Sequence, residues 1–413
     1  MNAQSSVGVP TAVELFAGAG GMALGCHRAG FKHLALLELD ENAVGTLLAN
    51  QGEHSGIQSA LPIESCDVRG FDFEQIHSAV DLLAAGAPCQ PFSLGGKHRG
   101  RSDSRNLFPE VFRAQRDLRP KAVLLENVRG LARKSFRPYL EYLLLQLALP
   151  GIRARLEDDW QVHKRSLLDA LQSGETGGRP AYHVSFASLN CADFGVPQRR
   201  HRVFMVAIRT DLGLPFEWPA PTHSREALLY SQFVSGDYWK RHGIGQPEGS
   251  LRGERIVPQS NGLRPWVTVR DALEGVPEPV MEQSHPHHPN HVGVPGARAY
   301  PGHTGSPFDE PSKTLKAGVH GVPGGENMIR YTDGTLRYLT VHEAGLIQTF
   351  PAEYVFVGSR TEAMRQIGNA APVRVGEVIA RAIIERLRPP QTIQSVSSGP
   401  RVALIDDRPL ALV

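Results

Sequence analysis

The stretch that decides the fold is AVELFAGAGGMALGCHRA, residues 12–29. Its unbroken apolar start, Ala12–Phe16, predicts a buried strand, and Gly21–Ala29 predicts the helix that follows. Between them, Gly18–Ala23 has the pattern Gly-x-Gly-x-x-Ala, which is typical of the turn in a dinucleotide-binding βαβ unit. The stretch therefore predicts a parallel sheet whose first turn approaches a bound ligand.

The alternation of strand and helix continues through the first half of the chain. Apolar runs predict further strands at His33–Glu38, Asp81–Ala85, Ala122–Leu125 and Val203–Ile208, and periodic runs predict helices at Glu41–Asn50, Leu107–Leu118 and within 136–172. Apolar strands separated by helices are typical of parallel sheets covered on both faces. We expect an α/β protein with a doubly wound, mostly parallel sheet.

The character of the sequence changes after about residue 210, where Pro, Gly and His become frequent and periodic runs become rare. Helical periodicity resumes near Thr340. We therefore expect a catalytic, cofactor-binding domain at 1–210 plus 335–390 with the C-terminal helix packed back on it, a smaller irregular domain at 211–334, and a mobile tail at 391–413.

Composition limits the function classes. The 413 residues are 41% hydrophobic and carry 44 Lys+Arg against 42 Asp+Glu, so any site for a polyanion must come from local clustering. The four cysteines form no CxxC pair, which favours a reduced setting. The N-terminus has no signal-peptide pattern, and no apolar run reaches the ~20 residues that span a bilayer. We expect a soluble cytoplasmic protein.

Two acidic residues follow the predicted strands near the glycine-rich turn. Glu38 lies 20 residues beyond Gly18 and can accept hydrogen bonds from ribose hydroxyls. These residues alone indicate an adenosine-containing cofactor, either a dinucleotide or S-adenosylmethionine. The alternative is a glycine-rich turn that binds no ligand. Asp67 is a candidate for the adenine amino group, although an ordinary turn aspartate fits the local sequence equally well.

Cys89 lies between two prolines in GAPCQPFS, directly after a predicted strand. Open α/β sheets bind their ligands at the carboxyl ends of strands. The following segment, Gly95–Arg105, is glycine-rich and has a local net charge of +3 over Lys97–Arg105, which suits a phosphate backbone. In isolation, a single cysteine is also common as a small buried apolar residue.

Further charged residues occur at two other strand ends. Glu126, in AVLLENV, is expected on the same sheet edge as Cys89, although an acid there is often a helix cap. In QRRHR, which precedes the strand VFMVAI, alternation would direct Arg200 and Arg202 to one face. A solvated charge run is the alternative for these arginines.

Taken in order, these blocks resemble the DNA cytosine-C5 methyltransferase family. The matching blocks are FAGAGG, ELD, APCQPFS, ENV, PQRRHRV, RYLTVHE, QTFP and QIGNAAP, and they span about residues 12–210 and 310–388. The resemblance implies a class I S-adenosylmethionine-dependent methyltransferase fold, which is Rossmann-like. It also implies methyl transfer from S-adenosylmethionine to C5 of a specific, flipped cytosine in double-stranded DNA. A nicotinamide enzyme would explain only the first block.

The resemblance also implies roles for individual residues. Cys89 matches the nucleophile that adds to cytosine C6 and forms a covalent intermediate. Glu126 matches the acid that engages N3 and the exocyclic amine. Arg200 and Arg202 match arginines that fix and polarise the base and position the nucleophile loop. The residues that match cofactor contacts are Phe16, Gly18, Gly20, Glu38, Asp67, Pro88 and Asn369.

Residues 211–330 match the family's target-recognition region. Arg225–Arg270 has a net charge of +3 and contains Tyr238, Trp239 and Trp266, a combination that suits DNA contact. The segment HPHHPNH supplies His285, His287, His288 and His291, but no cysteine lies nearby and the spacing follows no zinc-ligand pattern. We expect no metal.

The expected partner is double-stranded DNA, together with a cognate restriction endonuclease that shares the target site unless the enzyme is an orphan. We expect a monomer and no membrane association. Two alternatives stay open: a methyltransferase of RNA, with tRNA as substrate, and a catalytically inactive DNA-binding relative. The large insert favours a DNA-reading domain, and the presence of both Cys89 and Glu126 argues against a protein that only binds.

Overall fold

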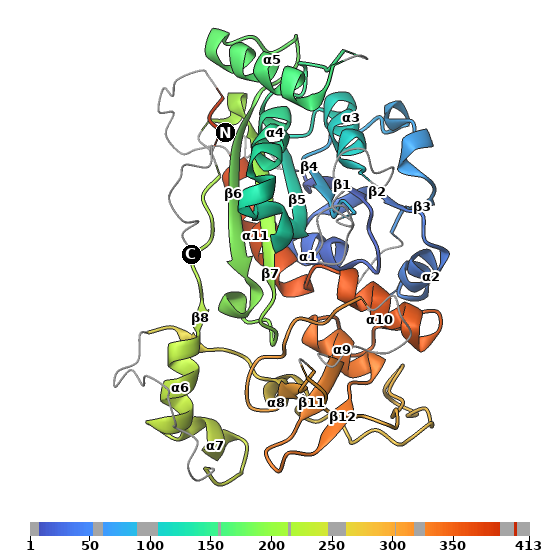
Figure 1. The fold of residues 1–413 in the computed structure, drawn as a ribbon. Coiled ribbons are helices and arrows are strands. Elements are labelled where there is room, and N and C mark those ends of the chain that lie inside the picture. The colour runs from blue at the N-terminus through green and yellow to red at the C-terminus, as the bar shows by residue number, and fades with distance from the viewer. Residues whose placement is uncertain are drawn as a thin grey trace, which may run out of the picture.

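A computed structural model describes residues 8–52, 61–88, 106–155, 158–213, 216–246, 262–301, 303–317, 327–388 and 400–402. Within these ranges the main sheet has seven strands in the order β3-β2-β1-β4-β5-β7-β6 (Figure 1). The strands are β1 Thr11–Leu15, β2 Lys32–Glu38, β3 Ile63–Ser65, β4 Leu82–Ala85, β5 Ala122–Val128, β6 Tyr182–Asn190 and β7 His201–Arg209. Among these strands only β7 runs opposite to the other six, pairing antiparallel with β5 and β6, so the mostly parallel sheet is confirmed.

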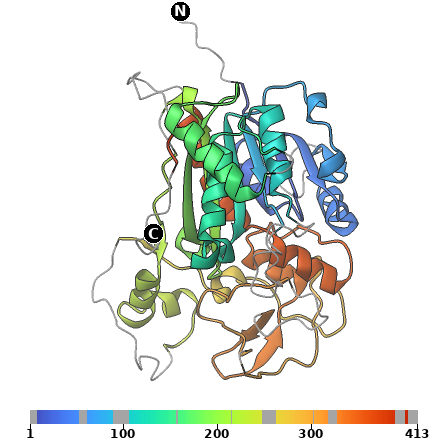
Figure 2. The same cartoon turned by 45° about the horizontal axis from the view of Figure 1, so that its top comes forward.

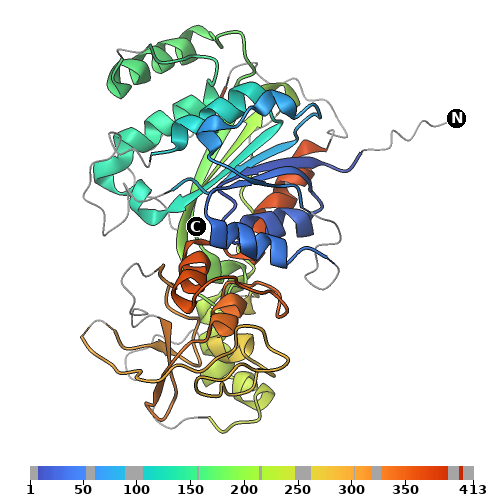
Figure 3. The same ribbon diagram turned by 90° about the vertical axis from the view of Figure 1, so that its right-hand side faces the viewer.

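Helices cover both faces of this sheet (Figures 1 and 3). On one side lie α3 Phe108–Leu118, α4 Arg137–Ala148 and α5 Trp160–Ser173, and on the other α1 Gly21–Ala29, α2 Glu41–Ala49 and α11 Val373–Leu387. The side chains of β5 alternate between the two cores. Val123 and Leu125 pack towards α3 and α4, whereas Ala122 and Leu124 pack towards α1 and α11. The sheet is therefore doubly wound.

The C-terminal helix α11 packs against α1, so the two ends of the chain share one core (Figure 2). Glycine makes this contact possible. A Cβ atom on Gly25 would lie 2.6 Å from the backbone nitrogen of Glu377, and one on Gly21 would overlap the carbonyl of Ala371. Any side chain at these positions would push the two helices apart.

A second region lies beyond the carboxyl ends of the parallel strands (Figure 1). Its elements are β8 His223–Ser224, α6 Arg225–Phe233, α7 Asp237–Arg241, β9 Arg264–Pro265, α8 Val269–Ala272, β10 Ser306–Pro307, β11 Met328–Arg330 and β12 Leu336–Tyr338. Then follow α9 Val341–Ile347 and α10 Arg360–Asn369. Leu315 and Ile329 of this region share a core with Leu47 of α2 and Ile347 of α9, which fixes the two regions together.

Two of the three aromatic residues expected to contact DNA, Tyr238 and Trp239, belong instead to the core of this second region. Tyr238 and Trp239 are buried, and their rings pack edge to face. The Trp239 indole donates to the carbonyl of Gln232, and the partly buried Trp266 donates to Asp193. Because Tyr238 and Trp239 are buried and their polar groups are satisfied inside the protein, we correct the expectation that these two residues contact DNA. For the partly exposed Trp266 the expectation stays a prediction.

Several local expectations also needed correction. Phe16 does not continue β1 but has a left-handed backbone with φ of 59°. The helical run at 136–172 splits into α4 and α5, because Asp159 caps a new helix. Strand β6 was missed because polar residues interrupt its apolar pattern. Within the expected tail, the carbonyl of Arg401 accepts a 2.8 Å hydrogen bond from Val184 of β6. Val402 forms a parallel bridge with Val184, and residues 391–399 and 403–413 lie outside the described ranges.

Candidate functional site

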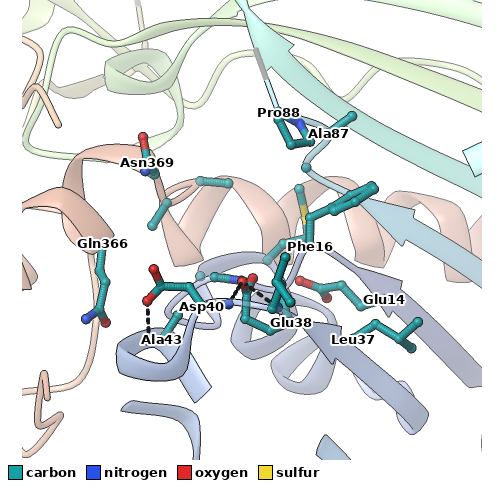
Figure 4. Close-up of a pocket in the computed structure, with 18 of the residues that line it drawn as sticks. Glu14, Phe16, Leu37, Glu38, Asp40, Ala43, Ala87, Pro88, Gln366 and Asn369 are labelled. Atoms are coloured by element: carbon teal, nitrogen blue, oxygen red, sulfur yellow. Dashed lines mark hydrogen bonds between the residues drawn. The ribbon is translucent and has the colours of Figure 1, made fainter. Parts of the chain in front are cut away.

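A cavity of about 720 Å³ opens at the carboxyl ends of β1, β2, β4 and β5 (Figure 4). Its size is that of a site for a medium-sized ligand. Eight of the residues singled out from the sequence line it: Phe16, Gly18, Glu38, Asp67, Pro88, Glu126, Arg202 and Asn369. Gly20 and Arg200 lie elsewhere, and Cys89 is outside the described residues, immediately after Pro88.

The turn after β1 places Phe16 between Ala87–Pro88 and Glu38 (Figure 4). A left-handed conformation costs a residue with a side chain about 1–2 kcal/mol, and such strain often marks functional sites. Gly18 follows with φ of 54°, and nothing lies within 4 Å of where its Cβ would be. The turn therefore leaves open space beside its backbone.

Gly20 has a different role. It is the N-cap residue before α1 and has φ of 81°, and a Cβ there would lie 2.8 Å from Leu47 and 3.1 Å from the hydroxyl of Tyr354. That hydroxyl donates a 2.7 Å hydrogen bond to the carbonyl of Ala19. Gly20 thus allows the close packing that holds the turn, and does not itself line the cavity.

The Glu38 carboxylate organises the end of β2. Its Oε2 accepts a 2.7 Å hydrogen bond from the backbone N–H of Gly18, and its Oε1 accepts from those of Leu39 and Asp40, each at 2.8 Å. A carboxylate has about four acceptor sites. One site on Oε2 therefore stays available to a ligand in the cavity.

The opposite wall comes from α10, whose last residue is the exposed Asn369. Arg365 of this helix pairs with Asp40 at 2.6 Å, which ties α10 to α2. Asp40 in turn caps α2 by accepting from the N–H of Ala43 (Figure 4). Partial burial would raise the pKa of Asp40, but the hydrogen bond from Arg365 holds that pKa below its usual value.

Asp67 lies at the rim of the cavity. It accepts hydrogen bonds from the Arg69 guanidinium and from the backbone N–H of the same residue. The hydrogen bond from this guanidinium lowers the pKa of Asp67. The structure thus keeps Asp67 ionised, with its carboxylate engaged by Arg69.

Glu14 lines the same cavity and was missed by the sequence reasoning (Figure 4). It is 2% exposed, and within the described part of the chain its Oε2 accepts no hydrogen bond. His33 Nε2 lies 3.6 Å from that oxygen, and burial raises the pKa of Glu14. The signal in the sequence was an acid inside an otherwise apolar strand.

Glu126 and Arg202 both line the cavity and form an ion pair. Arg202 Nε lies 2.8 Å from Glu126 Oε1, and both side chains are largely buried. The antiparallel pairing of β5 with β7 aligns Val128 with Arg202 and so brings the two residues together. Asn127, which the sequence reasoning did not single out, donates a 3.1 Å hydrogen bond to the carbonyl of Ala87, two residues before Cys89.

Arg200 is fully buried and does not line the cavity. Its guanidinium donates to the carbonyls of Leu315 at 3.0 Å, Gly368 at 2.7 Å and Ala370 at 3.0 Å. Because β7 begins only at His201, strand alternation does not place Arg200 on the same face as Arg202.

The imidazole rings of the histidine-rich segment pack against one another. His285 and His288 have ring centroids 4.7 Å apart, and the ring nitrogens of His291 lie 3.0 Å from Thr340 Oγ1 and 2.9 Å from the carbonyl of Pro277. Across the described ranges, no group of three or more His, Cys, Asp or Glu side chains is arranged to hold a metal ion. Nor is any helix in those ranges long and apolar enough to cross a membrane.

The family model described as C-5 cytosine-specific DNA methylase matches residues 11–151 and 161–385. The Type II methyltransferase M.Eco47II of Escherichia coli is 32% identical over 92% of the chain and 80% of that protein. M.NgoMIV of Neisseria gonorrhoeae is 31% identical over 92% of the chain and 98% of its own length.

The fold also has a solved counterpart. The crystal structure of a Spodoptera frugiperda DNMT2 mutant superposes with a TM-score of 0.53 at 15% identity, covering 91% of this chain and 99% of that one.

Proposed function

The chain belongs to the C-5 cytosine-specific DNA methylase family, as its ordered motifs predicted, and we propose that it methylates C5 of one specific cytosine in double-stranded DNA. One observation carries this proposal. The Glu126–Arg202 pair shares a cavity with the glycine-rich turn and with Pro88, which directly precedes Cys89. The acid, the arginine, the glycine-rich turn and the residue that precedes the proposed nucleophile thus lie at one edge of the sheet.

S-adenosylmethionine fits the described cavity. Glu38 has one acceptor site for a ribose hydroxyl, Phe16 and Asp67 border the space for adenine, and Asn369 closes the far wall. The buried Glu14, whose Oε2 lacks a hydrogen bond from the described residues, suits the ammonium of the methionine part. When bound, the cofactor supplies the methyl group that C5 receives.

The chemistry of the chain's own residues begins with Cys89. Its thiolate adds to C6, and the electron pair of the C5–C6 double bond makes C5 nucleophilic. Glu126 binds N3 and the exocyclic amine and so favours this addition, while Arg202 fixes the Glu126 carboxylate. After C5 gains its methyl group, a base removes the C5 proton. The electrons of that C–H bond restore the double bond, and the thiolate of Cys89 leaves C6.

A cytosine within a duplex cannot reach this cavity, so the base must flip out of the helix. We assign target reading to residues 211–334 and catalysis to 1–210 with 335–390, with 391–413 as a tail. The Type II names of the relatives support a role in restriction–modification, with a cognate endonuclease as partner. Our proposal is a monomer that acts in the bacterial cytoplasm on the nucleoid.

Nucleoside analysis tests this function. Purified protein is incubated with S-adenosylmethionine and unmethylated bacterial genomic DNA, and in parallel with tRNA, before digestion and mass spectrometry. We expect 5-methyl-2′-deoxycytidine from the DNA and no methylated cytidine from the tRNA. Detection of N4-methylcytosine in the DNA, or of methylation in the tRNA alone, would overturn the proposal.

A further inference from the structure

A short basic segment follows the catalytic strand β5. In RGLARKSFR, residues 129–137, four cations occur: Arg129, Arg133, Lys134 and Arg137, which together we call the basic rim. No Asp or Glu occurs from residue 127 to residue 140. In a chain whose overall net charge is +2, such a local excess of positive charge stands out.

The acids nearest in sequence to the basic rim already have partners. Glu126 pairs with Arg202 at 2.8 Å, and Glu141 pairs with Lys164 at 2.7 Å. Within the part of the chain that the structure describes, the side chains of Arg129, Arg133 and Lys134 form no ion pair and no hydrogen bond. Arg129 and Lys134 are also exposed. These cations are therefore available to an external anion.

The basic rim starts at the active cavity. Val128 lines that cavity, and Arg129 is the next residue. Val128 pairs with Arg202 in the ladder between β5 and β7, so Arg129, which follows Val128, lies beside the start of β7. From the rim, α4 runs away from this end of the sheet towards α5 (Figure 1).

The start of β7 is also where the second region attaches. The backbone N–H of Arg199 donates a 2.8 Å hydrogen bond to the carbonyl of Ser312, and the hydroxyl of Thr314 donates to the carbonyl of Arg199. The basic rim thus borders the cavity on the side of the main sheet, close to the junction with the proposed target-reading region.

We propose that the basic rim binds the phosphate backbone of the DNA duplex beside the flipped cytosine. This inference rests on the proposed function. A flipped base enters the cavity still attached to its own backbone, so phosphates must pass close to the cavity rim. Arginine and lysine bind phosphates without reading sequence, and they fix the register of a protein on its duplex.

Salt dependence of DNA binding tests the basic rim. Each phosphate contact contributes about −0.9 to the slope of log K against log salt concentration. One contact therefore changes the binding constant by about eightfold for each tenfold change in salt. The unchanged enzyme is compared with Arg129→Gln, Lys134→Gln and the double variant. Lys32→Gln, which alters an exposed lysine at the amino end of β2, is the matched control. The probe is a fluorescent duplex of A·T pairs only, which contains no cytosine.

We expect each single variant to lose about one unit of slope and the double variant about two, while Lys32→Gln keeps the slope of the unchanged enzyme. Equal slopes in all proteins would overturn the inference, and so would an equal change in Lys32→Gln. A parallel methylation assay on cytosine-containing DNA keeps the tests separate. If the unchanged enzyme methylates this DNA while all slopes stay equal, only the inference about the basic rim is refuted, and the proposed function stands.

Discussion

Arg200 donates a hydrogen bond of 2.7 Å from Nη2 to the carbonyl oxygen of Gly368, directly before Asn369 on the cofactor-side wall. The side-chain amides of Gln198 and Gln348 form further hydrogen bonds between the start of β7 and α10. Gln198 Nε2 donates to Gln348 Oε1 at 3.1 Å, and Gln348 Nε2 donates to the carbonyl of Ile367 at 2.6 Å. Arg200 is therefore a positioning residue, which holds the last sequence block against the start of β7.

We predict that Arg200→Met destabilises the protein and weakens cofactor binding together. The substitution removes the donor to the carbonyls of Leu315 and Gly368, while Ala370 keeps its hydrogen bond from Gln348, and unsatisfied buried groups cost about 1–3 kcal/mol each. Urea unfolding is expected to show a loss of several kcal/mol, and calorimetry at least a tenfold weaker affinity for S-adenosylmethionine. Unchanged cofactor affinity in a folded variant would contradict the positioning role.

Cys89→Ser is expected to abolish turnover while S-adenosylmethionine binding stays within a few-fold of the unchanged enzyme. A serine hydroxyl is a far weaker nucleophile than a thiolate at neutral pH, whereas the cavity residues on the described elements are untouched. Methylation assays and calorimetry measure the two effects. An equal loss of cofactor binding would refute the separation of roles.

Glu126→Gln tests the acid at the cavity wall. The variant keeps the size of the side chain but removes the charge that faces Arg202, so we expect kcat to fall about 10²–10⁴-fold with little change in cofactor affinity. Glu141→Gln is the matched control, because Glu141 is also ion-paired but lies on α4, outside the cavity. Equal kcat values for the two variants would rule out a role for Glu126 in turnover.

Stability is expected to fall below pH 6.5 because of His342. Burial, together with neighbouring His291 and His288, lowers the pKa of this residue to about 4. Between that value and the unfolded pKa of about 6.5, the unfolded chain binds more protons, so stability rises with pH in this window. Melting curves from pH 4 to 7 should show a flatter profile for His342→Gln than for the exposed control His287→Gln. Parallel profiles would contradict this assignment.

The sheet was predictable from sequence because its central strands are buried on both faces and read as apolar runs, as in β4 and β5. Strand β6 could not be predicted in this way, because it lies at the sheet edge and only part of it is buried. The left-handed turn at Phe16 also escaped prediction, since an aromatic residue after an apolar run reads as one more strand residue.

Residue type and order identified most residues of the candidate site, because carboxyl ends of parallel strands converge on one edge. Eight of these residues line the cavity. The sequence could not separate Arg200 from Arg202, since only the tertiary packing shows which guanidinium is bound by carbonyls and which faces Glu126. Glu14 could not be predicted as a site residue for a similar reason, because only the tertiary structure shows that it is buried and lines the cavity.

The most direct test of the central claim is bisulfite sequencing of the genome of a bacterial host that lacks cytosine methylation and expresses this protein. Cells that express soluble Cys89→Ser provide the baseline. We predict protected cytosines in one recurring short sequence context with the unchanged protein, and complete conversion with Cys89→Ser. Complete conversion with soluble, unchanged protein would contradict the assignment of the chain as an active DNA cytosine-C5 methyltransferase.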